Sequence, residues 1–492
     1  MKNITYIILL VLGCQLSSFA QTDLALSLEE VISRAQKQSI QSRQVSVRLM
    51  SSYWQYRSFK AKYLPQIGFQ ATLPSLTRSL VNQIQDDGSS KYVGQSYMRN
   101  SAGFMVSQSI PWTGGQVELG LDLDRTDNFN FGTVNYLSNP IYLNISQPIF
   151  RFNAMRWERK IEPLRYEESK KISAEEMESI SIQATMFFFN YYTAQLELES
   201  AQLDKINADT LYKISKGRYT VGKIAENELL QIELQVMNAE ARVAQATSDL
   251  RSSGENLRNF LNIKEAVKFD LKLDDELENI VIDKDKAIEE AYKNRKMATA
   301  HQRRRLEAER DVREAKWNNG VSLNIQANFG LTQTGATLPE AYTNPQDQEQ
   351  LSVSLYVPIA DWGRRKGARQ VALANKELTE LNIEQEKISF EQDILLNIER
   401  FDLMSNKVKI AKKAFEIAHK SYDLATKRYR IGKIGITDLN QAFTSRDNAR
   451  KSQIQALRDY WVSYYDLRYV TLYDFKADQP IDHKLDVEPK KK

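Results

Sequence analysis

Alternating apolar and polar residues mark several short segments of this chain as β-strands. In residues 321–329, Val, Leu, Ile, Ala and Phe alternate with Ser, Asn, Gln and Asn, a period of two that puts the apolar side chains on one face. Residues 351–357, 117–123, 67–73 and 143–149 show similar alternation. Each run alone fits a strand of a soluble sheet. Because the runs lie between very long helical stretches, we interpret them as strands with lipid on one face and an aqueous lumen on the other.

Two long segments have the composition of helices. Residues 154–261 and 364–473 are rich in Ala, Glu, Lys, Gln, Leu and Arg, and their only proline is Pro163. A break is expected in each segment, at Gly222 and at residues 432–435. An unbroken helix over the stretch before Gly222 would be roughly 100 Å long. A seven-residue repeat after Gly222 predicts a coiled-coil seam, formed by Leu229, Ile232, Val236, Ala239, Val243, Ala246, Leu250 and Leu257.

The two halves of the chain are copies of each other. A shift of 210 residues places residues 218–224, RYTVGKI, on residues 428–434, RYRIGKI, with five of seven identities. The same shift aligns the prolines at 148 and 358. The repeated unit is a helix, strands, a proline, a long helix, a tight tip and a second long helix. Such a unit cannot bury its faces alone, so we expect assembly with further copies.

The chain begins with the pattern of an export signal. Lys2 supplies a positive charge, residues 4–12 are apolar, and Ser-Phe-Ala at 18–20 fits a cleavage site, so the mature chain would start at Gln21. The only cysteine, Cys14, lies inside this signal, which leaves the mature chain without a thiol or disulfide. Because the residues before Cys14 loosely resemble a lipoprotein lipobox, lipidation stays an open alternative.

Charge and hydropathy exclude several classes of protein. The 67 basic and 63 acidic residues are spread along the chain, so no nucleic-acid partner is expected. After the signal there is no run of 18 apolar residues, and no helix is expected to span a membrane. An exported protein that sits in a bilayer must then close its strands into a barrel, because every backbone polar group needs a partner in lipid.

No catalytic, cofactor or metal site is expected either. His301, His419 and His483 are scattered among lysine-rich helices or in the tail, and we expect each at the surface. Gly222 and Gly432 lie between helices and lack the preceding strand of a phosphate-binding loop. We therefore predict that the chain is not an enzyme.

The order of elements, the paired R-Y-x-x-G-K-I tips and the Leu64-Pro65 and Gln147-Pro148 junctions resemble the TolC family of outer-membrane efflux proteins. The resemblance covers essentially the whole mature chain. It implies an α+β membrane protein that works as a homotrimer, with a β-barrel shared by three subunits in outer-membrane lipid and a helical coiled-coil tunnel in the periplasm. The channel would serve a tripartite efflux or type I secretion system as a passive exit duct for small molecules or proteins. Its partners would be a periplasmic adaptor and an inner-membrane pump.

This resemblance also predicts the layout of the chain. The family pattern has two strands per repeat, but residues 103–125 form an extra hairpin turned at 113–115, which leaves four to six strands per subunit open. The expected segments begin with a signal at 1–20 and a first repeat at 21–261, which has strands at about 65–150 and a tip near 218–228. An equatorial linker at 262–285 and a second repeat at 286–473 follow, with strands at about 319–359 and a tip near 428–438. The chain ends in a C-terminal tail at 474–492, of which residues 483–492 are expected to be solvated.

Two sets of functional residues follow from the resemblance. Adaptor contacts are expected at the tips, on Val221, Gly222, Lys223, Ile431, Gly432 and Lys433. A pore gate is expected just past the tips, on Asp438, Glu228, Asn227 and Tyr429. The two acids equally fit a helix start favoured by the helix dipole. Ile434 and Gln441 depart from the family, since its best-known member has a gate-tying arginine and a second acidic ring there, so fewer ionic ties are expected.

Two other classes of protein remain as alternatives. A periplasmic adaptor shares the coiled-coil seams, but it would have one helical hairpin and no strands of membrane length. A structural coiled coil of the cell envelope would lack the 210-residue duplication.

Overall fold

The fold is described from a computed structural model, for residues 23–86, 88–265, 267–273 and 280–483. The expected export signal with Cys14, the end of the tail at 484–492 and residues 274–279 of the expected linker lie outside the described residues. The chain divides into two compact units. We call residues 50–169 and 296–387 the sheet unit, and the remaining described residues the hairpin unit.

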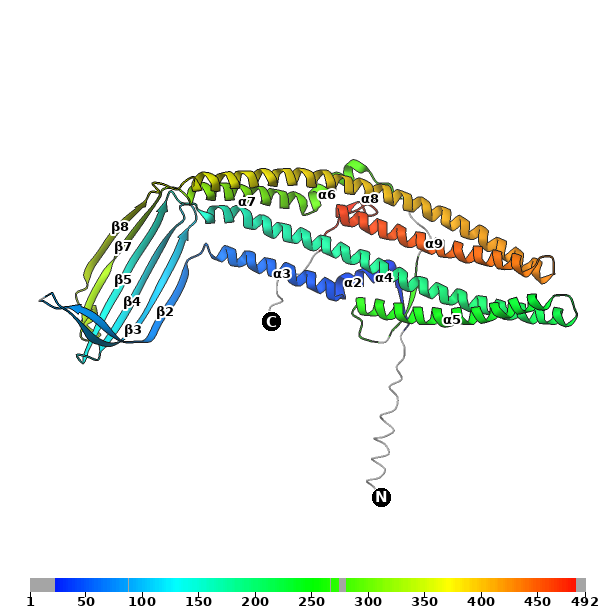
Figure 1. The fold of residues 1–492 in the computed structure, drawn as a ribbon, viewed down its shortest axis with the longest axis horizontal. Coiled ribbons are helices and arrows are strands. Elements are labelled where there is room, and N and C mark those ends of the chain that lie inside the picture. The colour runs from blue at the N-terminus through cyan, green and yellow to red at the C-terminus, as the bar shows by residue number, and fades with distance from the viewer. Residues whose placement is uncertain (1–22, 87, 266, 274–279, 484–492) are drawn as a thin grey trace, which may run out of the picture. The chain divides into compact units, whose positions relative to one another are not determined.

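The sheet unit contains one antiparallel sheet of six strands in the order β2-β3-β4-β5-β7-β8 (Figure 1). The expected extra hairpin, residues 103–125, forms the end of β3 and most of β4. Both strands lie within the sheet between β2 and β5, so all six strands belong to one sheet. A short 3-10 turn, η1 at Glu340–Tyr342, lies between the last two strands. The strands are β2 (Gln66–Ile84), β3 (Ser90–Ile110), β4 (Gly115–Asn128), β5 (Thr133–Ile149), β7 (Ser322–Gly335) and β8 (Gln346–Tyr356).

Strand register places apolar residues on one face of this sheet and polar residues on the other. Directly opposed residues of antiparallel strands point to the same face. In a single copy the apolar face is exposed to solvent, since Ile67 is 80% and Leu355 is 62% exposed. One apolar row across the strands is formed by Ile67, Val106, Leu119, Leu143 and Phe329. The neighbouring row on the opposite face is formed by Ser107, Glu118, Asn144, Asn328 and Gln350.

Four helical segments complete the sheet unit: the end of α3 (Ile40–Ala61), the start of α4 (Ala154–Thr220), α7 (Met297–Trp317) and the start of α8 (Arg364–Arg430). Within the described residues, no helix combines the length and the hydropathy needed to cross a bilayer.

His301 corrects one expectation, because it is 3% exposed in α7 and not a surface residue. Its Nε2 lies 2.9 Å from Glu386 of α8, which also accepts hydrogen bonds from Arg304. The aromatic ring is covered because α7 packs on α8, a contact that the charged residues around it in the sequence do not reveal.

The hairpin unit holds most of each duplicated long helix and the helices that follow them. The helices α4 and α8 are 67 residues each, and α5 (Glu226–Phe260) and α9 (Ile436–Thr471) follow them. The offset of 210 residues holds throughout, at 154 against 364, 220 against 430 and 226 against 436. The other elements of the unit are β1 (Asp23–Ser27), α2 (Leu28–Gln38), the start of α3, β6 (Lys268–Lys272), α6 (Lys284–Asn294), β9 (Tyr473–Asp474) and β10 (Gln479–Pro480).

The core of the hairpin unit forms where β1 and β6 meet the long helices. The two strands pair in parallel, which joins the start of the chain to the segment between the repeats. Phe188 and Phe189 of α4 and Tyr460 and Tyr464 of α9 are all at most 2% exposed in this core. The seam expected along α5 is buried at Ile232, Ala239, Ala246 and Leu257, as its seven-residue spacing predicts.

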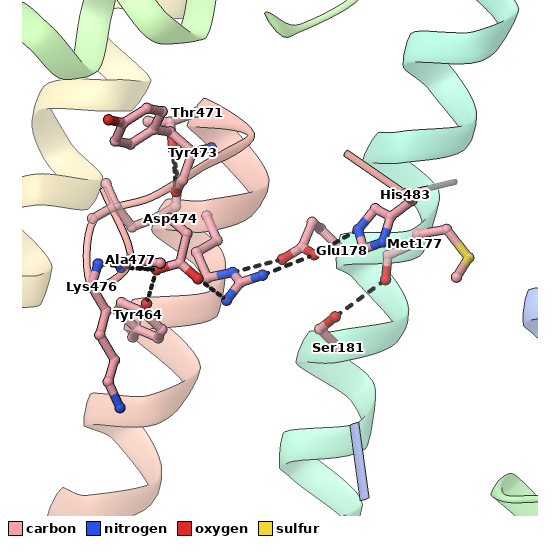
Figure 2. A network of polar contacts seen from close by, with 12 residues as sticks. Met177, Glu178, Ser181, Tyr464, Thr471, Tyr473, Asp474, Lys476, Ala477 and His483 are labelled. Atoms are coloured by element: carbon pink, nitrogen blue, oxygen red, sulfur yellow. Dashed lines mark hydrogen bonds and ion pairs between the residues drawn. The ribbon is translucent and has the colours of Figure 1, made fainter. Parts of the chain in front are cut away.

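The start of the C-terminal tail is held on the long helices. Asp474 lies 2.7 Å from Arg468, and His483 lies 2.8 Å from Glu178 of α4 (Figure 2). Residues 474–483 are therefore held on the helices, and His483 is not a free surface residue. The reason is Glu178, a carboxylate with no exposed surface, which needs charged or polar partners.

Candidate functional site at the helical tips

Both helical hairpins turn through the same backbone motif. Gly222 has φ 71° and Gly432 has φ 74°, a left-handed conformation that glycine adopts without a steric penalty. In each turn the next lysine N–H donates to the carbonyl of the arginine five residues back, at 2.9 Å, from Lys223 to Arg218 and from Lys433 to Arg428. The shared motif explains why the two sequence copies agree best at these positions.

The turns present backbone and apolar side chains to solvent. Val221 and Ile431 are each 66% exposed, and the glycines and lysines beside them are exposed as well. A methyl group built on Gly222 would meet no atom within 4 Å, and one on Gly432 would lie 3.4 Å from the Arg218 guanidinium. Packing within the chain therefore leaves the outer surface of both tips free.

Arg218 joins the two tips. Its guanidinium donates to the Arg430 carbonyl at 2.8 Å and lies 5.6 Å from the centre of the Tyr429 ring. The Tyr429 hydroxyl is 3.0 Å from Ser215 Oγ. The repeated RY motif could have pointed to Arg218, but the sequence carries no signal that it crosses to the other hairpin.

Of the four expected gate residues, three lie on the first turns of α5 and α9 and the fourth is buried. Asp438 and Asn227 are exposed and Glu228 is half-buried. Tyr429 is only 2% exposed and packs with Tyr422 in the small core behind the tips. Its side chain, on α8, contacts Ser215 and Arg218 of α4 and so joins the two hairpins of one copy. Neither Ala225 nor Gly435, the N-cap residues, has a side chain that can cap the helix, so the nearby acids also compensate the free N–H groups.

Deeper in the hairpins, buried ion pairs tie the four helices together. Arg446 of α9 and Asp204 of α4 are 11% and 5% exposed in their side chains and lie 2.8 Å apart. The Arg446 guanidinium also lies 4.4 Å from the centre of the Tyr422 ring, on α8. Arg242 of α5 adds contacts to Glu197 at 2.9 Å and to Asp447 at 3.3 Å.

Burial of Arg242 opposes its charge, but the surrounding carboxylates outweigh this effect and raise its pKa. Sequence reasoning missed these ties, since Asp204 and Arg446 are 242 residues apart.

The outward face of α8 carries an apolar stripe with no covering element in one copy. We call it the α8 stripe, and its six residues are spaced by seven and are 60 to 70% exposed. Five of them lie on α8, and the sixth, Ile431, directly follows the last residue of the helix. The opposite side of the same helix, with Ile394, Phe401 and Val408, is buried. The repeat was visible in the sequence but not singled out. The α8 stripe consists of Leu396, Leu403, Ile410, Ile417, Leu424 and Ile431.

Comparisons with known proteins agree with this arrangement. The model of a family described as outer membrane efflux protein matches residues 31–262 and 287–471. Among curated proteins no match was found. A membrane protein from Pseudomonas aeruginosa has a similar fold, with a TM-score of 0.67, 13% identity, and coverage of 96% of this chain and 94% of that one.

Two outer-membrane channels are also similar in fold. For CmeC of Campylobacter jejuni the TM-score is 0.65 at 15% identity, with 93% of this chain and 87% of that chain covered. For the open state of MtrE of Neisseria gonorrhoeae the TM-score is 0.62 at 15% identity, with 95% of each chain covered.

Proposed function

Because the chain belongs to the outer membrane efflux protein family, we propose that it is the channel subunit of a tripartite efflux or type I secretion system. It would act as a passive exit duct for small molecules or proteins and catalyse no reaction. The observation that carries the proposal is the α8 stripe, because a row of exposed apolar residues that runs along a long helix to its tip requires further helices to cover it.

We infer that the covering helices come from identical copies in a trimer. On α5, Leu230, Leu234 and Met237 form a second exposed apolar row that could meet such a stripe. The sheet also supports assembly from several copies, because β2 and β8 are its edge strands and each leaves one backbone edge unpaired. Pairing of β2 with β8 of the next copy would satisfy these edges.

The sheet is the part of the chain that we place in the outer membrane. Its apolar face is continuous over all six strands and exposed in one copy, and its other face is polar. A sheet with one lipid-facing and one lumen-facing side needs this division. The helices would then lie in the periplasm.

The tips are the surfaces that we propose for the adaptor, which would link the channel to an inner-membrane pump. Val221 and Ile431 offer exposed apolar contacts, and the neighbouring glycines let a partner approach the backbone closely. Asp438, Glu228 and Asn227 lie just past the tips and would line the constriction, while Tyr429 would anchor the hairpins behind it.

Conductance tests the channel itself. The purified full-length chain should form stable ion-conducting pores in planar bilayers and should migrate as a trimer that dissociates on heating. A periplasmic adaptor or a structural coiled coil would give neither result. Membrane-associated trimers without any conductance, across voltages and lipid compositions, would contradict the proposal.

Replacing both tip glycines with asparagine tests adaptor docking while it preserves the backbone turn. Asn tolerates the left-handed conformation, so Gly222→Asn with Gly432→Asn should keep the hairpins and the trimer while its side chains obstruct the partner. We expect efflux in cells to fall to the level of a strain without the channel. The matched control is Gly217→Asn in α4, which is exposed and off the turn. Full efflux by the double variant would contradict the proposal that the adaptor binds the tips.

A further inference from the structure

A groove of about 660 Å³ lies in the sheet unit, where the strands end and the helices begin. Its walls come from the end of α3, the start of α4 and the turn between β3 and β4. Trp112, in that turn, is 75% exposed. The side chains that matter here are four aromatic rings, Tyr56, Phe59, Tyr63 and Trp112, and two cations, Lys60 and Arg159.

Hydrogen bonds hold the three walls together. The Gln108 amide of β3 donates to the Tyr63 carbonyl at 3.1 Å, and the Tyr63 hydroxyl donates to the Met155 carbonyl of α4 at 2.9 Å. Asn153 donates to the Pro111 carbonyl of the turn at 2.8 Å. The groove is therefore formed before any ligand enters it.

The groove lies at the end of the apolar face of the sheet. Ile110 lines the groove, and it shares its side of β3 with Val106 and Phe104, because alternate residues of a strand point the same way. Val106 and Phe104 belong to the exposed apolar face. Aromatic rings gathered at the limit of such a face are typical of the boundary between lipid tails and headgroups.

The groove carries positive charge without a carboxylate among its lining residues. Among the described residues no ion pair involves Lys60 or Arg159, and the Lys60 ammonium lies 4.5 Å from the centre of the Tyr56 ring. Glu158 and Glu162 line a neighbouring groove with Lys62, and Glu162 pairs with Arg165 at 2.6 Å. An anion in the groove would therefore meet two cations, and no carboxylate of the lining, beside an apolar wall.

We propose that this groove binds a phospholipid of net negative charge. Its phosphate lies between Lys60 and Arg159, its glycerol region lies against the aromatic rings, and its acyl chains run along the apolar face past Ile110. The inference rests on the proposed function, because it requires the sheet to be in a membrane. A free phosphate would use the two cations but none of the aromatic wall.

Native mass spectrometry of the delipidated full-length protein tests the site. We compare phosphatidylglycerol with phosphatidylcholine of identical chains, and the wild type should bind the anionic lipid more tightly. Removing both cations, in Lys60→Ala with Arg159→Ala, should weaken phosphatidylglycerol binding about thirtyfold, as expected for two lost contacts to an anionic headgroup. The matched control is Arg57→Ala with Lys160→Ala, which removes the same charges from the same two helices outside the groove. That control should bind as the wild type does.

Three results would overturn the inference: equal binding of the two lipids, an equal loss in the control variant, or displacement of the lipid by glycerol 3-phosphate at equal concentration. The last would indicate a site for free phosphate groups. Conductance in pure phosphatidylcholine bilayers keeps the two proposals apart. A wild-type pore there, together with no preference for the anionic lipid, overturns the lipid site and leaves the channel function standing.

Discussion

Glu178 is a carboxylate with no exposed surface in the middle of α4, and it depends on two residues from the end of the chain. Arg468 Nε donates to it at 3.1 Å and His483 Nε2 lies at 2.8 Å (Figure 2). Arg468 also contacts Asp474. Burial of Asp474 favours its neutral form, but the Arg468 charge and hydrogen bonds from the Tyr464 hydroxyl and two backbone N–H groups lower its pKa. Arg468 is thus the cation on which the buried Glu178 and the half-buried Asp474 rely.

Arg468→Met removes that cation and keeps a side chain of similar length. Because it leaves Glu178 buried without its cation, we expect a loss of about 3 to 5 kcal/mol. Hydrogen exchange in α4 around residue 178 measures the loss as a local opening free energy. The control is Arg458→Met on the same helix, whose side chain is 39% exposed and whose ion pair with Asp459 is worth little. Equal losses in both variants would contradict the role of Arg468.

His301 predicts a response to pH in the sheet unit. Burial lowers the pKa of His301, although Glu386 opposes the effect. Hydrogen bonds from Arg304 in turn hold the pKa of Glu386 at about 2, so the carboxylate stays charged. The folded chain therefore resists protonation of His301, whereas the unfolded chain takes up the proton near pH 6.5. The stability from neutral His301 is complete above that pH and declines below it, down to the lowered pKa.

His301→Gln should remove this pH dependence. In the wild type, the protection of α7 against hydrogen exchange, corrected for the intrinsic rate, should fall from pH 7.5 to pH 5. In the variant it should stay flat, because glutamine does not titrate in that range. His419→Gln, at a side chain 54% exposed, should behave as the wild type does. A fall of the same size in His301→Gln would show that other groups cause it.

At the scale of elements, α8 has two apolar seams with different partners. Ile394, Phe401 and Val408 are buried against helices of the same copy, and the α8 stripe faces outward along the same turns. A helix with apolar residues on two sides is either central in a domain or shared between subunits. Since nothing within the described residues covers the α8 stripe, its role belongs to assembly and not to folding of one copy.

Ile410→Asn with Ile417→Asn tests this division. The variant should lose the trimer on native gels and in sedimentation while its helix content by circular dichroism remains, because the buried seam is untouched. The matched control, Lys409→Asn with Glu416→Asn, changes exposed residues of the same turns, keeps the net charge and should stay trimeric. An intact trimer in the isoleucine variant would place the interface on another face.

At the scale of the whole assembly, the threefold axis of the proposed trimer would turn single acids into rings. Asp438 is exposed on the first turn of α9, just past the tip, and each copy would contribute one carboxylate. Like charges confined around one narrow lumen attract cations, and multivalent cations most strongly. The buried tie between Asp204 and Arg446 lies behind this turn and would hold the helices that carry the ring.

Asp438→Ala should lower the cation selectivity of the pore and its block by multivalent cations in planar bilayers, with the largest effect at low salt. Asp423→Ala, an exposed acid of α8 on the other side of the tip, provides the comparison and should conduct as the wild type does. Unchanged selectivity and block in Asp438→Ala would leave Asp438 with the role of an ordinary helix-start residue.

The sequence by itself determined the elements, because the signals for them are local. Alternation of side chains predicts strands, glycines that interrupt helical stretches predict the turns at 222 and 432, and heptad spacing predicts the α5 seam, all within a few residues. The 210-residue duplication was also visible from the sequence, and the helix boundaries follow it.

Only the tertiary structure decided which residues meet. The pairing of Asp204 with Arg446 spans 242 residues, and that of Glu178 with His483 spans 305. Local patterns carry no information on such distances, so His301 and His483 were expected at the surface. Strand order placed the extra hairpin inside the sheet, and helix packing left one seam of α8 buried and the other open. Burial depends on what packs against a side chain, and that is settled only when distant segments come together.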